Sequence, residues 1–68
     1  MTKKEFLNKY KIGKSYRARV GAHLYKIHLL AIVDECMIVF KYYEKHKQYW
    51  RYEVGSFDTT DSHIKLMW

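Results

Sequence analysis

Apolar and polar residues alternate with a period of two over much of the region between residues 15 and 54. Tyr16, Ala18 and Val20 alternate with polar or cationic neighbours, and the segment from Gln48 to Val54 alternates in the same way. Successive side chains of a β-strand point to opposite faces of a sheet, so this period indicates strands with one apolar face each. A chain with this pattern is restricted to a fold that is mainly β.

Polar turn segments separate the alternating stretches, as turns do between strands. They fall at residues 21–22, 34–35 and 44–47, and a longer polar loop covers residues 55–62. The loop contains an Asp-Thr-Thr-Asp run that predicts a turn or a single 3₁₀ turn. The sequence therefore predicts five antiparallel strands, at residues 15–20, 23–33, 36–43, 48–54 and 63–68.

Each predicted strand has an expected core face. In the second strand the odd positions are apolar throughout, whereas the even positions change from polar to apolar after His28. This change predicts a long, bent strand that is covered on both faces near its end. The apolar odd positions of the second strand are Tyr25, Ile27, Leu29, Ala31 and Val33, the expected core-facing residues of the fourth are Trp50, Tyr52 and Val54, and Ile64, Leu66 and Trp68 share one side of the fifth.

A short helix is predicted before the strands, at about residues 2–11. Thr2 and Glu5 have the spacing of a capping box, in which each side chain accepts a hydrogen bond from the other residue's backbone amide. Phe6 and Tyr10 are four residues apart and form an apolar stripe on such a helix. Gly13 is placed to end it in a left-handed conformation.

Taken together, the 68 residues predict a single α+β domain with the β-region at about residues 14–68. The number and length of the strands, and the short polar turn before the last one, resemble the SH3-like small barrels, including Tudor-type and KOW-type modules. This resemblance implies a small closed barrel, which leaves no exposed sheet edge. A strongly bent or open antiparallel sheet with the helix across one face is the alternative.

Cys36 is the only cysteine, so no disulfide can form within the chain. It lies in an apolar run, and we expect it to be a buried hydrophobic residue in a reducing compartment. The longest uncharged apolar stretch, Leu29 to Val33, is too short to cross a membrane, and no signal segment follows Met1. These features predict a cytoplasmic protein that does not use a membrane.

The formal net charge is +6, and it is unevenly distributed. Residues 1–33 carry eight Lys or Arg residues and one acid, whereas residues 34–68 carry five bases and six acids. Basic surfaces attract nucleic acids, anionic lipids or acidic proteins. The charge therefore predicts one basic face and one mixed face.

No catalytic or metal-binding pattern is recognisable. The four histidines and one cysteine lack the spacing of zinc ligands, and three glycines form no phosphate-binding loop. A domain of this size also has little space for a preorganised pocket. We therefore expect neither an enzyme nor a cofactor or metal site.

The segment 41–51 is the strongest candidate contact surface because it combines aromatic and cationic residues on a predicted hairpin. Lys41 and Tyr43 share one strand face, and Tyr49 and Arg51 share a face of the next strand. If these two faces coincide, rings and cations form one surface that can stack on bases and contact phosphates. The predicted contact residues are Lys41, Tyr43, Lys45, His46, Lys47, Tyr49, Arg51, Arg17 and Arg19.

The same composition is typical of protein-binding hot spots, which are rich in Tyr, Trp and Arg. Three interpretations therefore stay open: a protein partner including a second copy of the chain, single-stranded DNA or RNA, and a plain solvated hairpin. An aromatic cage for a methylated side chain is a further, weaker idea. In style the chain resembles small cytosolic proteins of bacteriophages and mobile elements, many of which occlude a host nuclease, defence complex or polymerase. The first hypothesis is such a stoichiometric inhibitor, and nucleic-acid binding is the alternative.

Overall fold

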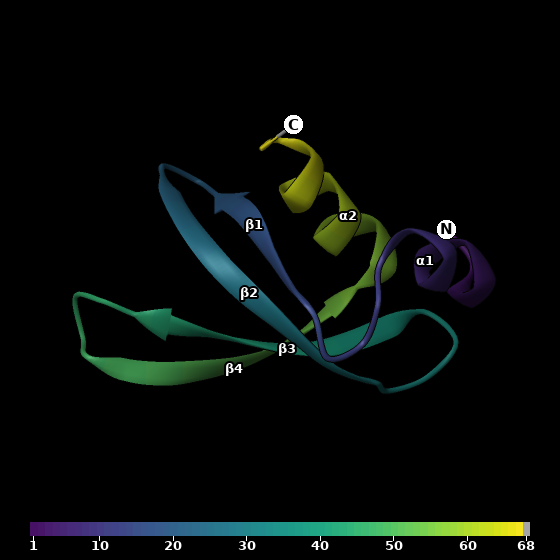
Figure 1. Ribbon diagram of the computed structural model, residues 1–68, viewed down its shortest axis with the longest axis horizontal. Helices are drawn as coiled ribbons and strands as arrows, with labels where there is room; N and C mark the ends of the chain where they lie inside the picture. The colour runs from purple at the N-terminus through teal and green to yellow at the C-terminus, as the bar shows by residue number, and fades with distance from the viewer. Residues whose placement is uncertain (68) are drawn as a thin grey trace.

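The computed structural model describes residues 1–67, which form two helices and one antiparallel sheet of four strands (Figure 1). The order of the strands in the sheet follows their order in the chain, so each strand pairs with its sequence neighbour. The sheet is open, and β1 and β4 are its edges. The elements are α1 (Lys3–Lys9), β1 (Ser15–Val20), β2 (His23–Ile32), β3 (Met37–Glu44), β4 (Tyr49–Ser56) and α2 (Phe57–Lys65).

α1 begins as the sequence predicts. Glu5 N donates to Thr2 Oγ1 at 3.1 Å, and Thr2 N donates to Glu5 Oε1 at 2.9 Å, which completes the capping box. Phe6 and Tyr10 are both buried. The helix ends at Lys9 with Tyr10 in an extended conformation, so Gly13 does not end it as predicted; Gly13 adopts a φ of 89° in the turn that leads into β1. The predicted helix is therefore confirmed, with a shorter C-terminal end.

The C-terminal segment is a helix, so the predicted fifth strand is wrong. α2 begins after Ser56, whose hydroxyl accepts from Thr59 N at 3.1 Å. Its buried residues are Phe57, Thr60, Asp61 and Ile64, which have the spacing of one helical face. Two of these four buried residues are polar, so the helical period of the segment cannot be recognised from its apolar residues alone. Trp68, predicted at the end of the fifth strand, lies outside the described residues.

The two helices lie on the same side of the sheet, where they form the core with its covered face. Phe6 of α1 stacks on Phe57 of α2 with 4.7 Å between ring centroids. The core consists of Phe6, Tyr10, Ala18, Ile27, Leu29, Ile38, Phe57 and Ile64. Four of these residues come from β1, β2 and β3, and we call the sheet face that carries them the covered face. This arrangement matches the open-sheet alternative and not a closed barrel of five strands.

The two hairpins β1–β2 and β3–β4 diverge from a common base (Figure 1). The β2–β3 ladder extends only from the Ile32↔Ile38 pair to the His28↔Lys41 pair. β2 continues beyond this point to His23, and β3 continues to Glu44. The sheet is therefore split between β2 and β3 at the end farthest from α1.

A bulge between Leu29 and Ala31 changes which side chains of β2 are buried. Leu29 is fully buried, as predicted, but Leu30 and Ala31 are exposed. A bulge inserts one unpaired residue and bends the strand, so the alternation shifts by one position. The predicted bend is confirmed, whereas the predicted covering of both faces is wrong.

Cys36 is exposed in the β2–β3 turn, which corrects the prediction that it is buried. Its backbone N–H donates to the Asp34 carboxylate at 2.8 Å. A hydrogen bond with the Asp34 side chain and the negative charge of that side chain raise the pKa of the Cys36 thiol. The thiol is therefore accessible without being activated as a nucleophile.

Candidate functional site

The pairing register brings residues from all four strands onto the face of the sheet opposite the helices. Ser15 pairs with His28, His28 with Lys41, and Lys41 with Tyr52. Directly paired residues of an antiparallel sheet point to the same face. Alternation along each strand then defines the open face, which carries Arg17, Arg19, Leu24, Lys26, His28, Lys41, Tyr43, Trp50, Tyr52 and Val54.

The open face carries positive charge without strand acids to offset it. Its permanent cations are Arg17, Arg19, Lys26 and Lys41. The two acidic residues of the described strands, Glu44 and Glu53, lie on the covered face, because they pair with Tyr49 and Phe40. A surface with this charge distribution attracts anions.

Trp50 lies at the centre of an aromatic and cationic cluster on the open face. Lys41 Nζ lies 4.8 Å from the Trp50 ring centroid, within the range of a cation–π contact. The rings of His28 and Tyr43 each have their centroids 5.6 Å from Trp50 and meet it edge-on. Trp50 nevertheless remains 45% exposed, and neighbouring Tyr52 is 65% exposed. The cluster therefore holds the indole in place and leaves part of it available for contact.

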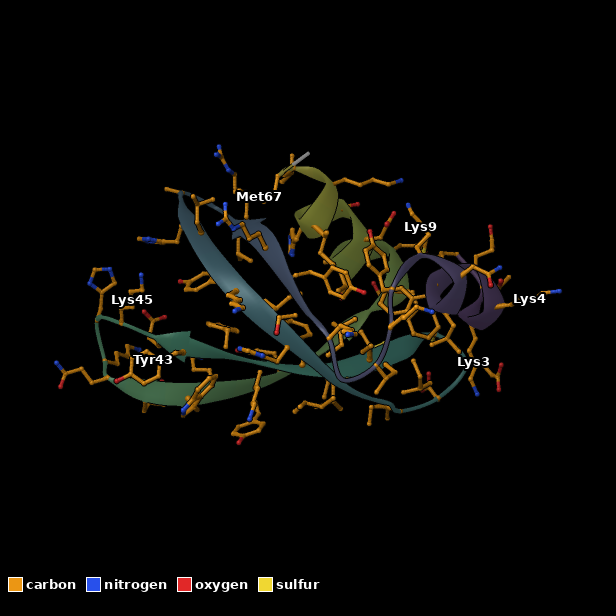
Figure 2. All side chains as sticks on the ribbon, viewed as in Figure 1. Lys3, Lys4, Lys9, Tyr43, Lys45 and Met67 are labelled. Atoms are coloured by element: carbon orange, nitrogen blue, oxygen red, sulfur yellow. The ribbon has the colours of Figure 1, made fainter. Side chains whose placement is uncertain are left out.

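The split between the hairpins forms a hollow of about 330 Å³ beside this cluster. Leu24, Lys26 and His28 line it from β2, Tyr43 and the buried Glu44 line it from β3, and Trp50 lines it from β4. Figure 2 shows Tyr43 and Lys45 at the free end of the β3–β4 hairpin. The hollow exists because β2 and β3 separate beyond the His28↔Lys41 pair.

The covered side of the split is closed by side chains. The rings of Tyr25 and Tyr42 are 4.5 Å apart, and the Tyr25 hydroxyl donates to Glu44 Oε2 at 3.4 Å. His23 and His46 lie at the tips of the two hairpins with ring centroids 5.8 Å apart. These contacts connect the two hairpins across the split.

The structure divides the predicted contact residues between two faces. Lys41 and Tyr43 lie on the open face, where the register adds Arg17 and Arg19. Tyr49 pairs with Glu44, and Arg51 pairs with Tyr42, so both lie on the covered face. The condition that the two hairpin faces coincide is therefore not met. The remaining predicted residues, Lys45, His46 and Lys47, are exposed in the β3–β4 turn.

Trp50, Tyr52 and Val54 were expected in the core and are exposed instead. The reason is that α2 packs on the other face of β4. A Cβ atom at Gly55 would lie 3.2 Å from Thr60 Oγ1, so the glycine permits this close approach. The apolar side of β4 is thus the side that the helices leave uncovered.

The sequence reasoning missed Lys26, His28, Trp50 and Tyr52 as contact residues. Lys26 and His28 occupy polar even positions of β2, which indicated that they are on the exposed side of that strand. The local sequence pattern did not indicate that this side joins the β3–β4 hairpin. The lysines of α1 do not extend this surface, because Lys3 and Lys4 lie at the opposite end of the molecule from Tyr43 and Lys45 (Figure 2).

Within residues 1–67, no group of three or more His, Cys, Asp or Glu side chains is placed to hold a metal ion. In the same part of the chain, no helix is long and apolar enough to cross a membrane. No family model matches the chain, and neither a curated protein nor a solved structure matches it. The resemblance to SH3-like barrels stays a prediction.

Proposed function

We propose that the chain binds single-stranded nucleic acid on the open face of its sheet. One observation supports this proposal: four permanent cations and three exposed aromatic rings lie on the same face of the sheet. Within residues 1–67, no acidic residue of the strands lies on that face. The rings are those of Tyr43, Trp50 and Tyr52. Bases stack on such rings while Lys and Arg side chains contact the phosphates.

The accessibility of the rings favours a single strand over a duplex. In a duplex the base faces already stack on each other, whereas a single strand has faces that are free to stack on protein rings. Trp50 is fixed by Lys41, His28 and Tyr43 and needs little reordering to accept a base. Each base stacked in this way contributes about 1–3 kcal/mol.

A protein partner is the second candidate, and it is the first hypothesis from the sequence; the cations of the open face would favour an acidic one. The observation that favours it is the apolar surface beside the cations, where Leu24 and Val54 are each 56% exposed. A stoichiometric inhibitor that occludes an acidic protein surface would use the same face. The two candidates differ in whether nucleic acid alone is sufficient for binding.

Fluorescence anisotropy with a labelled single-stranded oligonucleotide of about 10 nucleotides tests the proposal. The logarithm of the affinity should fall with the logarithm of salt concentration by about 0.7 per phosphate neutralised. The four permanent cations of the open face set an upper limit of about 3 for the magnitude of this slope. Trp50 fluorescence should change on binding.

Two tyrosines of the β3–β4 hairpin provide a matched comparison. Tyr43 on the open face is 42% exposed, and Tyr49 on the covered face is 44% exposed. Tyr43→Leu should weaken binding by about 5- to 150-fold, the equivalent of one lost stacking contact. Tyr49→Leu should change it by less than about twofold.

Equal losses for the two variants, or a flat salt response, would refute binding at this face. The second candidate would be favoured if the chain did not bind the oligonucleotide but did bind a polyanionic acidic protein, and if that binding survived nuclease treatment. Circular dichroism of both variants checks that the fold is retained.

A further inference from the structure

β4 is an edge strand of the sheet. Within residues 1–67 it pairs only with β3, and the hairpin end of β4 lies away from both helices, whereas its C-terminal end leads directly into α2 (Figure 1). α2 packs on the covered face of both edge strands, β1 and β4, and leaves the open face of β4 uncovered. Natural edge strands are usually protected by charged residues, above all Lys, by Pro or by bulges. Tyr49–Ser56 contains neither Lys nor Pro, its two charged residues, Arg51 and Glu53, have opposite signs, and its register with β3 is regular over eight pairs.

The residues of β4 are complementary to those of a second β4 running in the opposite direction. If Tyr52 of one copy faces Tyr52 of the other, Arg51 faces Glu53 on the covered side of the sheet. In the same register Trp50 faces Val54 on the open side. Opposite charges and aromatic–β-branched pairs both stabilise neighbouring antiparallel strands. This register therefore gives favourable cross-strand pairs on both faces.

The side chains concerned are accessible. Trp50, Tyr52 and Val54 are 45%, 65% and 56% exposed. Arg51 and Glu53 lie on the same face two residues apart, and Arg51 Nη2 is 3.0 Å from Glu53 Oε1. Both side chains remain more than one third exposed, so each has room for a second partner of opposite charge.

We propose that two copies of the chain pair through their β4 edges, antiparallel and with a two-fold axis at Tyr52. The partner is a second copy because the charge and packing pattern of β4 complements itself. The product is a continuous eight-stranded sheet with both pairs of helices on one side and both open faces on the other. This inference rests on the β4 edge alone and does not depend on the proposed function.

Sedimentation equilibrium and light scattering over a range of concentrations test the pairing. The wild-type chain should show a reversible monomer–dimer equilibrium. In Arg51→Glu, the new Glu faces Glu53 of the other copy, so the dimer contains two pairs of opposed acids. In Glu53→Arg, the new Arg faces Arg51 of the other copy, so the dimer contains two pairs of opposed bases. Each variant alone should raise the dimer dissociation constant by about tenfold or more. Arg19→Glu, which changes a charge on β1 by the same amount, is the matched control and should leave the dimer unchanged.

A mixture of the two variants gives the decisive result. In the mixed dimer every residue 51 faces a residue 53 of opposite charge, so an equimolar mixture should form a 1:1 heterodimer. The double variant Arg51→Glu/Glu53→Arg should likewise regain the homodimer.

A monomeric wild-type chain at millimolar concentration would overturn the proposal. A dimer that is insensitive to all three variants, or a mixture that stays monomeric, would overturn the β4 register. Circular dichroism distinguishes these outcomes from loss of the fold.

Discussion

Replacing Asp61 by Asn should weaken the hydrogen bonds and remove the ion pair that connect α1 to α2. The Asp61 side chain is about 10% exposed, and its Oδ1 accepts hydrogen bonds from the Tyr10 hydroxyl at 2.5 Å and from Lys9 Nζ at 2.9 Å. Lys65 Nζ lies 3.1 Å from Oδ2, one helical turn along α2. One carboxylate thus joins the end of α1 to the middle of α2.

The lowered pKa of Asp61 gives the amount by which its ionised carboxylate stabilises the fold. Burial raises the pKa, but hydrogen bonds from Tyr10, Lys9 and Lys65 outweigh burial and lower it from 3.8 to about 2. Each pKa unit corresponds to about 1.4 kcal/mol, so the ionised form stabilises the fold by about 2 kcal/mol. Because the pKa is lower in the folded state, this stability is present above pH 4 and is lost as the pH falls from 4 to 2.

Urea unfolding of the wild type and of Asp61→Asn at several pH values tests this reasoning. At pH 7 the variant should be less stable by about 2 kcal/mol, and the difference should shrink towards zero near pH 2. Asp58→Asn is the control, because the Asp58 side chain is 76% exposed and its ion pair with the Met1 amino group is screened by water, so its loss should change the stability little.

Equal stability of the wild type and Asp61→Asn at pH 7 would refute the argument. So would a difference that stays constant between pH 4 and pH 2. If Asp61→Asn does not fold, NMR titration of the wild-type carboxyl carbon gives the same information, with an expected midpoint near pH 2.

Two further predictions concern local features. Ser56→Ala removes the hydroxyl that accepts from Thr59 N at the start of α2, and urea unfolding should show a loss of about 1 kcal/mol; an unchanged midpoint would mean that this cap contributes nothing. Cys36 is exposed, so a thiol reagent should modify it in the folded protein, and Asp34→Asn should accelerate the reaction at pH 7 because Asp34 raises the thiol pKa. A thiol that reacts only in denaturant would contradict its exposure.

Short-range signals predicted the N-terminal helix and the first four strands. The capping box involves residues three positions apart, and each strand shows its period within a few residues. α2 escaped prediction because its buried face includes Thr60 and Asp61, which resemble loop residues until their partners are known. The Asp61 carboxylate is buried only because Lys9 and Tyr10, some fifty residues earlier in the chain, bond to it.

The candidate site was predicted in composition but not in arrangement. Lys41, Tyr43, Arg17 and Arg19 were named from the sequence and do lie on one face. Tyr49 and Arg51 were grouped with them, but a shift of one residue in pairing moves every side chain to the other face. That register depends on contacts between strands, which local alternation does not encode.

The sequence by itself determined that the chain is β-rich, that its first half is basic and that its aromatic hairpin lies in residues 41–51. Only the tertiary structure decided which strand faces join and which of them the helices cover. Pairing of His28 with Lys41, and of Lys41 with Tyr52, brings the cations of β1 and β2 onto the face that exposes Trp50. Packing of α1 and α2 on the opposite face leaves that surface open, because a helix covers only the face on which its own apolar stripe is buried.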